Sequence, residues 1–321
     1  MKVLVLGGGG FLGQKLAHSL AKRGNLGGTP ITRMTLADTE TPDPVDAPFP
    51  IEATICDITD ANSVSQTVTQ EADVIYLLAA IVSAHAEDDF TAGMSINLFG
   101  AFNVLERCRV LATKPVVVFT SSLAVYGGEI PDPLGDHSYT NPQNSYGAQK
   151  AMGEILINDY SRKGYIDGRA FRLPTISIRP GKSNRAASSF MSSILREPLN
   201  GQEAICPVDP DFRHYYLSPR KCVENLIRGT ELAAEDLGMN RVMQMPGRTW
   251  SIRQLVDAMT AVAGNTPAEL IRWESQPEVK RIVSGWKYDI HAPRAEAFGL
   301  SADTSFEDNI RYYLEDDKPT S

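Results

Sequence analysis

The sequence predicts an α/β protein with a doubly wound parallel sheet and a smaller C-terminal lobe. Two observations support this prediction. Short apolar runs, typical of buried parallel strands, alternate with amphipathic helical segments over the first half of the chain, and the first run leads directly into a glycine-rich turn. With 321 residues the chain is long enough for one large or two modest domains.

The composition is that of an ordinary globular protein and argues against several classes. A net charge of -8 is unfavourable for a general nucleic-acid binder, which must neutralise phosphates. The four cysteines lie far apart, without a CxxC pair or a histidine at ligand spacing, so we expect neither a disulfide framework nor a metal site. No apolar run reaches the roughly 18 residues of a membrane span, and the first is too short for a signal peptide. These features predict a cytoplasmic protein.

The first strand and the glycine turn behind it form the clearest local pattern. Residues 2–6 predict a buried strand, the spacing GxxGxxG follows without a gap, and leucines four residues apart then predict a helix to about residue 23. Glycines allow the backbone to approach a pyrophosphate, whose charge the helix N-terminus stabilises. A glycine turn without a ligand is the alternative. Its place after an N-terminal strand favours a dinucleotide site that includes Gly7, Gly10, Phe11, Leu12 and Gly13.

The second and third predicted strands add the adenosine end of this site. Residues 34–37 lead to Asp38, whose carboxylate can accept hydrogen bonds from ribose hydroxyls and would repel the extra phosphate of NADP. This favours NAD, although Asp38 could instead only cap a loop. The third strand, Ile51–Ile55, precedes Asp57 and Ile58, which we expect on either side of the adenine.

The fourth predicted strand ends in residues that would allow a cofactor to lie close to the sheet, namely Ala79 and Ala80 after Leu78. We expect residues 81–89 to form a loop on the ligand side, with Ser83 near a substrate. His85 is interpreted as an ordinary loop histidine.

A long helical stripe follows, formed by Met94, Leu98, Phe102 and Leu105. It predicts core packing or a subunit contact, and Asn97 lies one position off the stripe.

Two further strands place hydroxyl groups at the carboxyl edge of the sheet, where open α/β folds bind ligands. The fifth strand runs into Ser121 and Ser122, and the sixth ends at Pro174 and Thr175. We expect residues 1–175 to form a Rossmann domain and residues 176–321 to form mainly a substrate-binding lobe, with some segments returning to the first domain.

A helix from residue 144 onward carries Tyr146 and Lys150, whose spacing of four places both side chains on one face. An ammonium beside a phenol favours the phenolate, so this tyrosine can accept a proton at a lower pH than its usual pKa of about 10. The pair alone is also explained by an amphipathic helix.

Taken together, these motifs resemble the extended short-chain dehydrogenases/reductases, the family of nucleotide-sugar epimerases and dehydratases. The residues that carry the resemblance occur in the expected order: Gly7, Gly10, Gly13, Leu78, Ala79, Ala80, Asn97, Ser122, Tyr146 and Lys150.

The resemblance implies catalysis with NAD. Tyr146 would be the acid/base, Lys150 would hold the nicotinamide ribose and lower the pKa of the tyrosine, and Ser122 would polarise the substrate oxygen. The resemblance also implies that NAD contacts Leu78, Ala79, Ala80, Asn97, Ser121, Pro174 and Thr175, and that the protein is a homodimer.

The second half departs from the nucleotide-sugar enzymes. The Asp-Glu pair of the dehydratases is replaced by Leu123 and Ala124, and the usual Asn-rich turn and Tyr-Gly-Pro segment after the sixth strand are missing. Residues 173–182 resemble instead a family member that oxidises the C2 hydroxyl of a small sugar acid.

Such a substrate needs a cation for its carboxylate, ideally an arginine. The candidates are Arg179, Lys182, Arg185 and Arg213, each of which could also be an ordinary surface charge. Ser188 and Ser189 could meet substrate hydroxyls or merely begin a helix. A nucleotide-sugar 4-epimerase and a catalytically silent NAD-binding regulator remain alternative functions.

Overall fold

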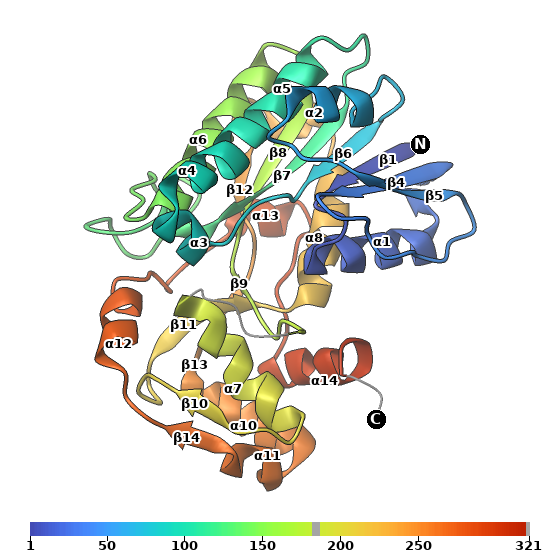
Figure 1. Ribbon diagram of the computed structural model, residues 1–321. Helices are drawn as coiled ribbons and strands as arrows, with labels where there is room; N and C mark the ends of the chain where they lie inside the picture. Colours follow the sequence, from blue (N-terminus) through green and yellow to red (C-terminus); the bar gives the residue numbers. More distant parts are fainter. Residues whose placement is uncertain (182–186, 319–321) are drawn as a thin grey trace.

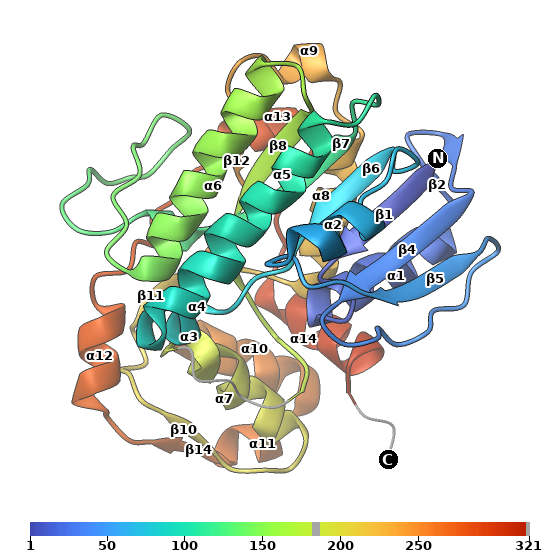
Figure 2. The ribbon, with the colours of Figure 1, turned by 45° about the horizontal axis from the view of Figure 1, so that its top comes forward.

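The computed structural model describes residues 1–181 and 187–318. It confirms the predicted fold class: a seven-stranded parallel sheet lies between two layers of helices, and a smaller lobe, formed mainly by the second half of the chain, packs beside it (Figures 1 and 2). The strand order is β12-β8-β7-β6-β1-β4-β5. The strands are β1 (Lys2–Leu6), β4 (Arg33–Asp38), β5 (Ile51–Ile55), β6 (Val74–Leu77), β7 (Val116–Ser122), β8 (Asp167–Leu173) and β12 (Val242–Gln244).

Alternation along each strand separates the two helical layers. Val3 and Val5 face one core and Leu4 and Leu6 the other. The first core packs against α1 (Phe11–Arg23), α8 (Pro219–Thr230) and α13 (Pro293–Ala297). The second packs against α2 (Ala61–Thr67), α5 (Ala101–Arg109) and α6 (Ser145–Arg162).

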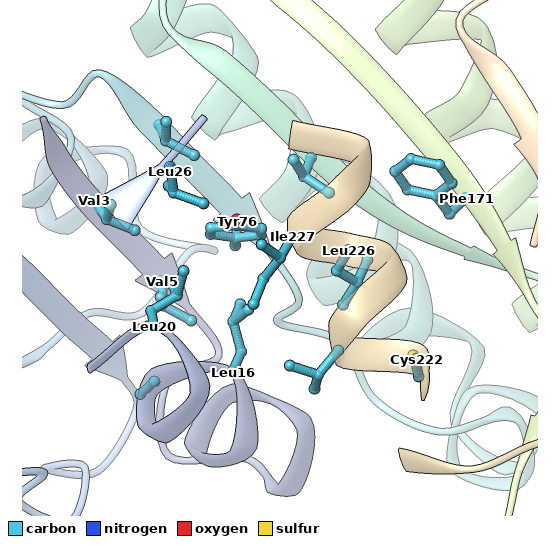
Figure 3. Packing of buried hydrophobic residues seen from close by; sticks show 14 of the residues in the cluster. Val3, Val5, Leu16, Leu20, Leu26, Tyr76, Phe171, Cys222, Leu226 and Ile227 are labelled. Carbon is cyan, nitrogen blue, oxygen red and sulfur yellow. The ribbon is translucent and has the colours of Figure 1, made fainter. Parts of the chain in front are cut away.

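Figure 3 shows the first core, where α8 lies beside α1 against the sheet. The ring of Tyr76 from β6 lies among Val5, Leu16 and Ile227, and all of these side chains are buried. Packing of apolar side chains on both faces explains why the parallel strands are almost continuously hydrophobic.

The smaller lobe has its own core, which includes Tyr216, Met259 and Phe306. One sheet has the order β13-β11-β9 and another pairs β10 with β14. The strands are β9 (Thr175–Ile176), β10 (Ala204–Cys206), β11 (Arg213–Leu217), β13 (Arg248–Ser251) and β14 (Ile271–Trp273). The helices are η3 (Ala187–Ser189), α7 (Phe190–Leu199), α10 (Ile252–Ala263), α11 (Asn265–Glu269), α12 (Pro277–Val283) and α14 (Phe306–Asp316).

The remaining elements are short. They are β2 (Asn25–Leu26), β3 (Thr29–Pro30), α3 (Ser83–Asp88), α4 (Phe90–Gly93), the π-helix η1 (Met94–Gly100), the 3-10 helix η2 (Leu123–Val125) and α9 (Ala234–Leu237). Within the described ranges, no helix is both long and apolar enough to cross a membrane. All four cysteines are buried and free.

The predicted loop at residues 81–89 is wrong, because most of it forms α3. Its buried residue Ala86 approaches Gly93, where an added Cβ would lie 3.1 Å from the Ala86 Cβ. This helix has only six residues and one buried side chain, so its sequence shows little helical periodicity.

The helical stripe is interrupted in a way that the sequence does not reveal. Its first part is the π-helix η1, in which Asn97 is buried while Phe99 is exposed. Leu105 remains in the core, as expected, and Phe102 is exposed.

The domain boundary at residue 175 remains a prediction. The chain beyond it forms most of the smaller lobe, but β12 pairs with β8 and α8 covers the large sheet.

A buried arginine joins these returning segments to the sheet. The fully buried side chain of Arg169 on β8 forms an ion pair with Asp167 at 2.5 Å. Its Nη1 also donates to the carbonyl oxygens of Gly229, Thr230 and Leu232, at 2.9, 2.9 and 3.1 Å. The arginine therefore satisfies carbonyl groups at the C-terminal end of α8, where a cation is favourable.

Replacing Arg169 with methionine is expected to lower the free energy of unfolding by about 3 kcal/mol, because the buried carbonyl groups and Asp167 lose their partner. Urea denaturation would measure the change. Arg162→Met is a matched control, since its ion pair with Asp159 is half exposed and should contribute less than about 1 kcal/mol. Equal losses from the two variants would contradict the structural role of Arg169.

Candidate active site at the carboxyl edge of the sheet

A cavity of about 350 Å³ lies at the carboxyl edge of the large sheet, between the strand ends and the smaller lobe. Fifteen of the predicted site residues line it: Gly7, Gly10, Phe11, Leu12, Gly13, Leu78, Ala80, Ser83, Ser121, Ser122, Tyr146, Lys150, Pro174, Thr175 and Arg179. The cavity thus brings together the glycine turn, the tyrosine helix and one candidate cation.

The glycine turn is shaped for close approach. Gly7 has φ +90°, and a Cβ there would lie 2.7 Å from the Ala79 backbone nitrogen. A Cβ on Gly13 would lie 2.1 Å from the carbonyl oxygen of Gly7. Helix α1 begins directly behind this turn, with Gly10 at its N-cap and no side chain capping it. The first backbone N–H groups of this 13-residue helix therefore form a cradle that fits a pyrophosphate.

Asp38 lies beside this turn, at the end of β4. Its Oδ2 accepts a hydrogen bond from the Gly9 N–H at 3.0 Å, and its Oδ1 accepts one from the Thr39 N–H at 2.8 Å. A carboxylate has capacity for further donors, so the position fits the ribose of a dinucleotide.

The predicted adenine contacts are placed differently. The Asp57 carboxylate accepts hydrogen bonds from the backbone and hydroxyl of Thr59, at 2.9 and 2.8 Å, and so closes a local turn. Ile58 is buried in the second core, where it approaches Gly100. Neither residue lines the cavity, and their roles at the cofactor remain predictions.

Local hydrogen bonds fix the start of α6. The Asn144 side chain accepts from the Gly147 N–H at 2.8 Å, and Glu87 of α3 accepts from the Ser145 N–H at 2.8 Å. A Cβ at Gly147 would lie 2.0 Å from the carbonyl oxygen of Ala124, so the glycine lets α6 pack directly against η2. This contact holds Tyr146 close to Ser122.

The Tyr146 hydroxyl shares a hydrogen bond with the Ser122 side chain. The Lys150 ammonium lies 5.6 Å from the centre of the Tyr146 ring and 4.7 Å from that of Phe119. All three predicted catalytic side chains therefore meet at one wall of the cavity.

The groups that shift the pKa of Tyr146 differ from the expectation that Lys150 alone lowers it. Burial raises the pKa of Tyr146 to about 12, opposed first by the positive charge of Arg179 and then by the hydrogen bond with Ser122. Burial also lowers the pKa of Lys150 to about 7. Arg179 is thus the main cation that favours the phenolate, a contribution that the motif does not reveal.

A second layer of polar contacts supports this wall. Glu154 on α6 accepts hydrogen bonds from Ser121 at 2.6 Å and from Arg172 at 2.8 and 2.7 Å. The Asn97 side chain accepts from the Ile81 N–H at 2.9 Å and donates to Gln149 at 2.8 Å. These contacts tie α6 to the ends of β6 and β7, and Asn97 acts here from behind the cavity.

The structure distinguishes between the candidate cations for the substrate carboxylate. Arg179 lines the cavity with its guanidinium 5.6 Å from the centre of the Phe11 ring. Arg213 is exposed and does not line the cavity. Lys182 and Arg185 lie outside the described residues.

Eight further residues line the cavity although the sequence did not single them out as site residues: Thr120, Leu173, Ile176, Pro180, Ile81, Val82, Ser192 and Arg196. Ser188 and Ser189, which sequence reasoning did raise, line the cavity as well. The Ser192 hydroxyl accepts from the Arg179 N–H at 3.1 Å, and Arg196 donates to the Arg179 carbonyl oxygen at 2.9 Å. Helix α7 therefore positions the Arg179 backbone through tertiary contacts that sequence spacing does not predict.

Comparison with known proteins agrees with this geometry. The model of the NAD dependent epimerase/dehydratase family matches residues 3–210. The D-erythronate dehydrogenase of Cupriavidus necator is 46% identical over 320 residues, which are 98% of each chain. The D-erythronate dehydrogenase of Haemophilus influenzae is 40% identical over 317 residues, covering 99% of this chain and all of that one.

Among solved structures, one from Agrobacterium tumefaciens described as a nucleoside-diphosphate-sugar epimerase has a TM-score of 0.94 and 42% identity. The match covers 98% of this chain and 94% of that one. The family predicted from the motifs is confirmed, and the chain belongs to the NAD dependent epimerase/dehydratase family.

Proposed function

We propose that this protein is an NAD-dependent oxidoreductase that oxidises the C2 hydroxyl of a small sugar acid, with D-erythronate converted to 2-dehydro-D-erythronate. The main observation behind the proposal is the position of the Arg179 side chain. It lines the cavity, and its positive charge is close enough to Tyr146 to act against the rise in the pKa of the phenol. An ion pair of Arg179 with a carboxylate is absent among the described residues, so its charge is available to a substrate acid. Two D-erythronate dehydrogenases at 46% and 40% identity over nearly the whole chain support the choice of acid.

The residues divide the reaction between them. Tyr146, as phenolate, accepts the proton of the C2 hydroxyl, while Ser122 donates a hydrogen bond to the same oxygen. Arg179 binds the neighbouring carboxylate, and Lys150 holds the cofactor ribose. Bound NAD supplies the hydride acceptor. The C2–H and O–H bonds break, a C2=O double bond forms, and the products are the 2-oxo acid, NADH and a protonated Tyr146.

The cofactor contacts follow from the strand ends. The turn from Gly7 to Gly13 and the start of α1 would hold the pyrophosphate, and Asp38 the adenosine ribose. Leu78, Ala80 and Pro174 line the same cavity as Tyr146, where they would contact the rest of the cofactor.

An epimerase is the second candidate, because the Agrobacterium tumefaciens structure at 42% identity carries that description. An epimerase returns the hydride to its substrate, so NADH does not accumulate, whereas the proposed reaction builds up one NADH per acid consumed. Absorbance of reduced nicotinamide with D-erythronate and with a UDP-sugar distinguishes the two. NAD binding without either activity would favour a silent regulator.

Tyr146→Phe is expected to lower turnover of D-erythronate by roughly 10²- to 10⁴-fold, because the proton acceptor is lost. NAD affinity should stay unchanged, which fluorescence titration would measure. Tyr139→Phe is a suitable control, since Tyr139 is exposed and does not line the cavity. Retained turnover in Tyr146→Phe would refute the assignment.

We further propose a homodimer through the outer face of α4, η1, α5 and α6. Large apolar side chains are exposed there, with Phe90 at 61%, Phe99 at 53% and Ile155 at 66%. Phe102 and Met152 belong to the same helices and are exposed at 39% and 36%. The elements that carry these side chains are neighbours in the fold, and large exposed apolar side chains gathered on one face are typical of subunit contacts.

Light scattering should give a mass of about twice the 35.1 kDa chain, and Ile155→Glu should shift it toward the monomer because a buried charge is costly. Met239→Glu provides a control on an apolar residue that is 70% exposed on a different part of the chain. A monomeric wild-type protein would contradict the proposal.

A further inference from the structure

Thr175 and His214 form a contact that the proposed chemistry does not yet use. Thr175 lines the cavity from β9, and its Oγ1 lies 2.7 Å from the Nε2 of His214 on β11. These two strands pair in parallel within the smaller lobe. The contact therefore connects the cavity wall to the core of that lobe.

The imidazole is enclosed by aromatic rings. It stacks on Phe212, with ring centres 6.4 Å apart and planes at 19°, meets the edge of Tyr216 at 5.6 Å, and packs on Trp286 at 5.3 Å. His214 is only 4% exposed, and burial lowers its pKa to about 3. The ring is thus neutral and has one fixed orientation.

The two ring nitrogens are not equivalent. Nδ1 is buried without a hydrogen-bond partner among the described residues, whereas Nε2 has Thr175. A proton on Nδ1 would be an orphaned buried N–H group, which is rarer than an unsatisfied buried acceptor. The proton therefore belongs on Nε2, which donates to the Thr175 oxygen.

This arrangement decides what Thr175 can do. Its oxygen accepts from the imidazole, so its own hydroxyl hydrogen is free to donate elsewhere. Accepting one hydrogen bond also strengthens the hydroxyl as a donor. The ligand on this side must then present an acceptor oxygen.

We propose that His214 is a positioning residue that holds the Thr175 hydroxyl as a hydrogen-bond donor to the substrate carboxylate, beside Arg179. The inference rests on the proposed function, and it adds a recognition element for acids. Thr175 lies four residues before Arg179 and lines the same cavity. Its strand β9 pairs with β11 of the smaller lobe, so we assign its hydroxyl to the substrate rather than to NAD, the contact that the family resemblance implies.

The tautomer can be tested without any activity. In ¹⁵N-histidine-labelled protein, two-bond ¹H–¹⁵N correlation spectra report which ring nitrogen carries the proton. The chain has five histidines, and His214→Gln would assign the signal while His18→Asn, an exposed position on α1, serves as the control. We expect protonated Nε2 and bare Nδ1 for His214. The reverse tautomer would overturn the inference.

Steady-state kinetics test whether Thr175 binds the carboxylate of the substrate. Thr175→Val is expected to raise the KM for the sugar acid roughly tenfold to hundredfold, as for the loss of one hydrogen bond to a charged group, with the NAD dissociation constant unchanged. Thr175→Ser should stay near wild type, and His214→Gln, which can keep a donor near the position of Nε2, should lie between wild type and His214→Met. The effects of His214→Met and Thr175→Val should not add, because both remove the same interaction.

Other outcomes would contradict the inference or the function on which it rests. An unchanged KM in Thr175→Val, or a weakened NAD affinity equal to the change in KM, would contradict a donor to the carboxylate. A wild-type protein that does not oxidise any sugar acid would refute the proposed function instead, while leaving the tautomer of His214 measurable.

Discussion

Burial of the Tyr146 hydroxyl is the constraint on which the rest of the site depends. A hydride transfer site must exclude water, but a dry phenol resists ionisation, and burial here raises its pKa to about 12. The surrounding residues act against this penalty: Ser122 stabilises the phenolate by a hydrogen bond and Arg179 by its charge. The same guanidinium can bind an acid, so substrate recognition and proton transfer share one group. A bound carboxylate would partly neutralise the charge of Arg179. With substrate present, Lys150 and the cofactor would therefore contribute more to lowering the pKa of Tyr146.

The fold holds this arrangement by contacts on both sides of the cavity. On the sheet side, Gly147 allows α6 to press against η2, and the pair of Glu154 and Arg172 anchors the helix to β7 and β8. On the other side, α7 fixes the backbone of Arg179 through Ser192. The site therefore depends on the packing of two lobes around one strand end, rather than on the helix motif alone.

Sequence patterns predicted the features that depend on neighbouring residues in the chain, but not those that depend on tertiary packing. Glycine spacing, strand hydrophobicity and the spacing of Tyr146 and Lys150 depend on neighbours in the chain, so the sheet and the tyrosine wall could be predicted. The electrostatic role of Arg179 and the contact between His214 and Thr175 depend on how the smaller lobe packs, for which the sequence has no periodic signal. The same reason explains why Asp57 and Ile58, placed by strand order alone, lie outside the cavity lining. Sequence spacing also could not show which of Arg179 and Arg213 would line the cavity, because both were candidates for binding the substrate carboxylate.

The shared role of Arg179 is the central claim, and the pH dependence of Arg179→Met measures it most directly. Removing the cation should raise the KM for D-erythronate roughly tenfold to hundredfold, from the loss of charge-assisted hydrogen bonds. It should also raise the pKa of Tyr146, so the acidic limb of the kcat profile should move to higher pH, because the active phenolate then forms only at higher pH. Arg213→Met, an exposed control, should change neither quantity. An unchanged KM together with an unchanged acidic limb in Arg179→Met would contradict the account.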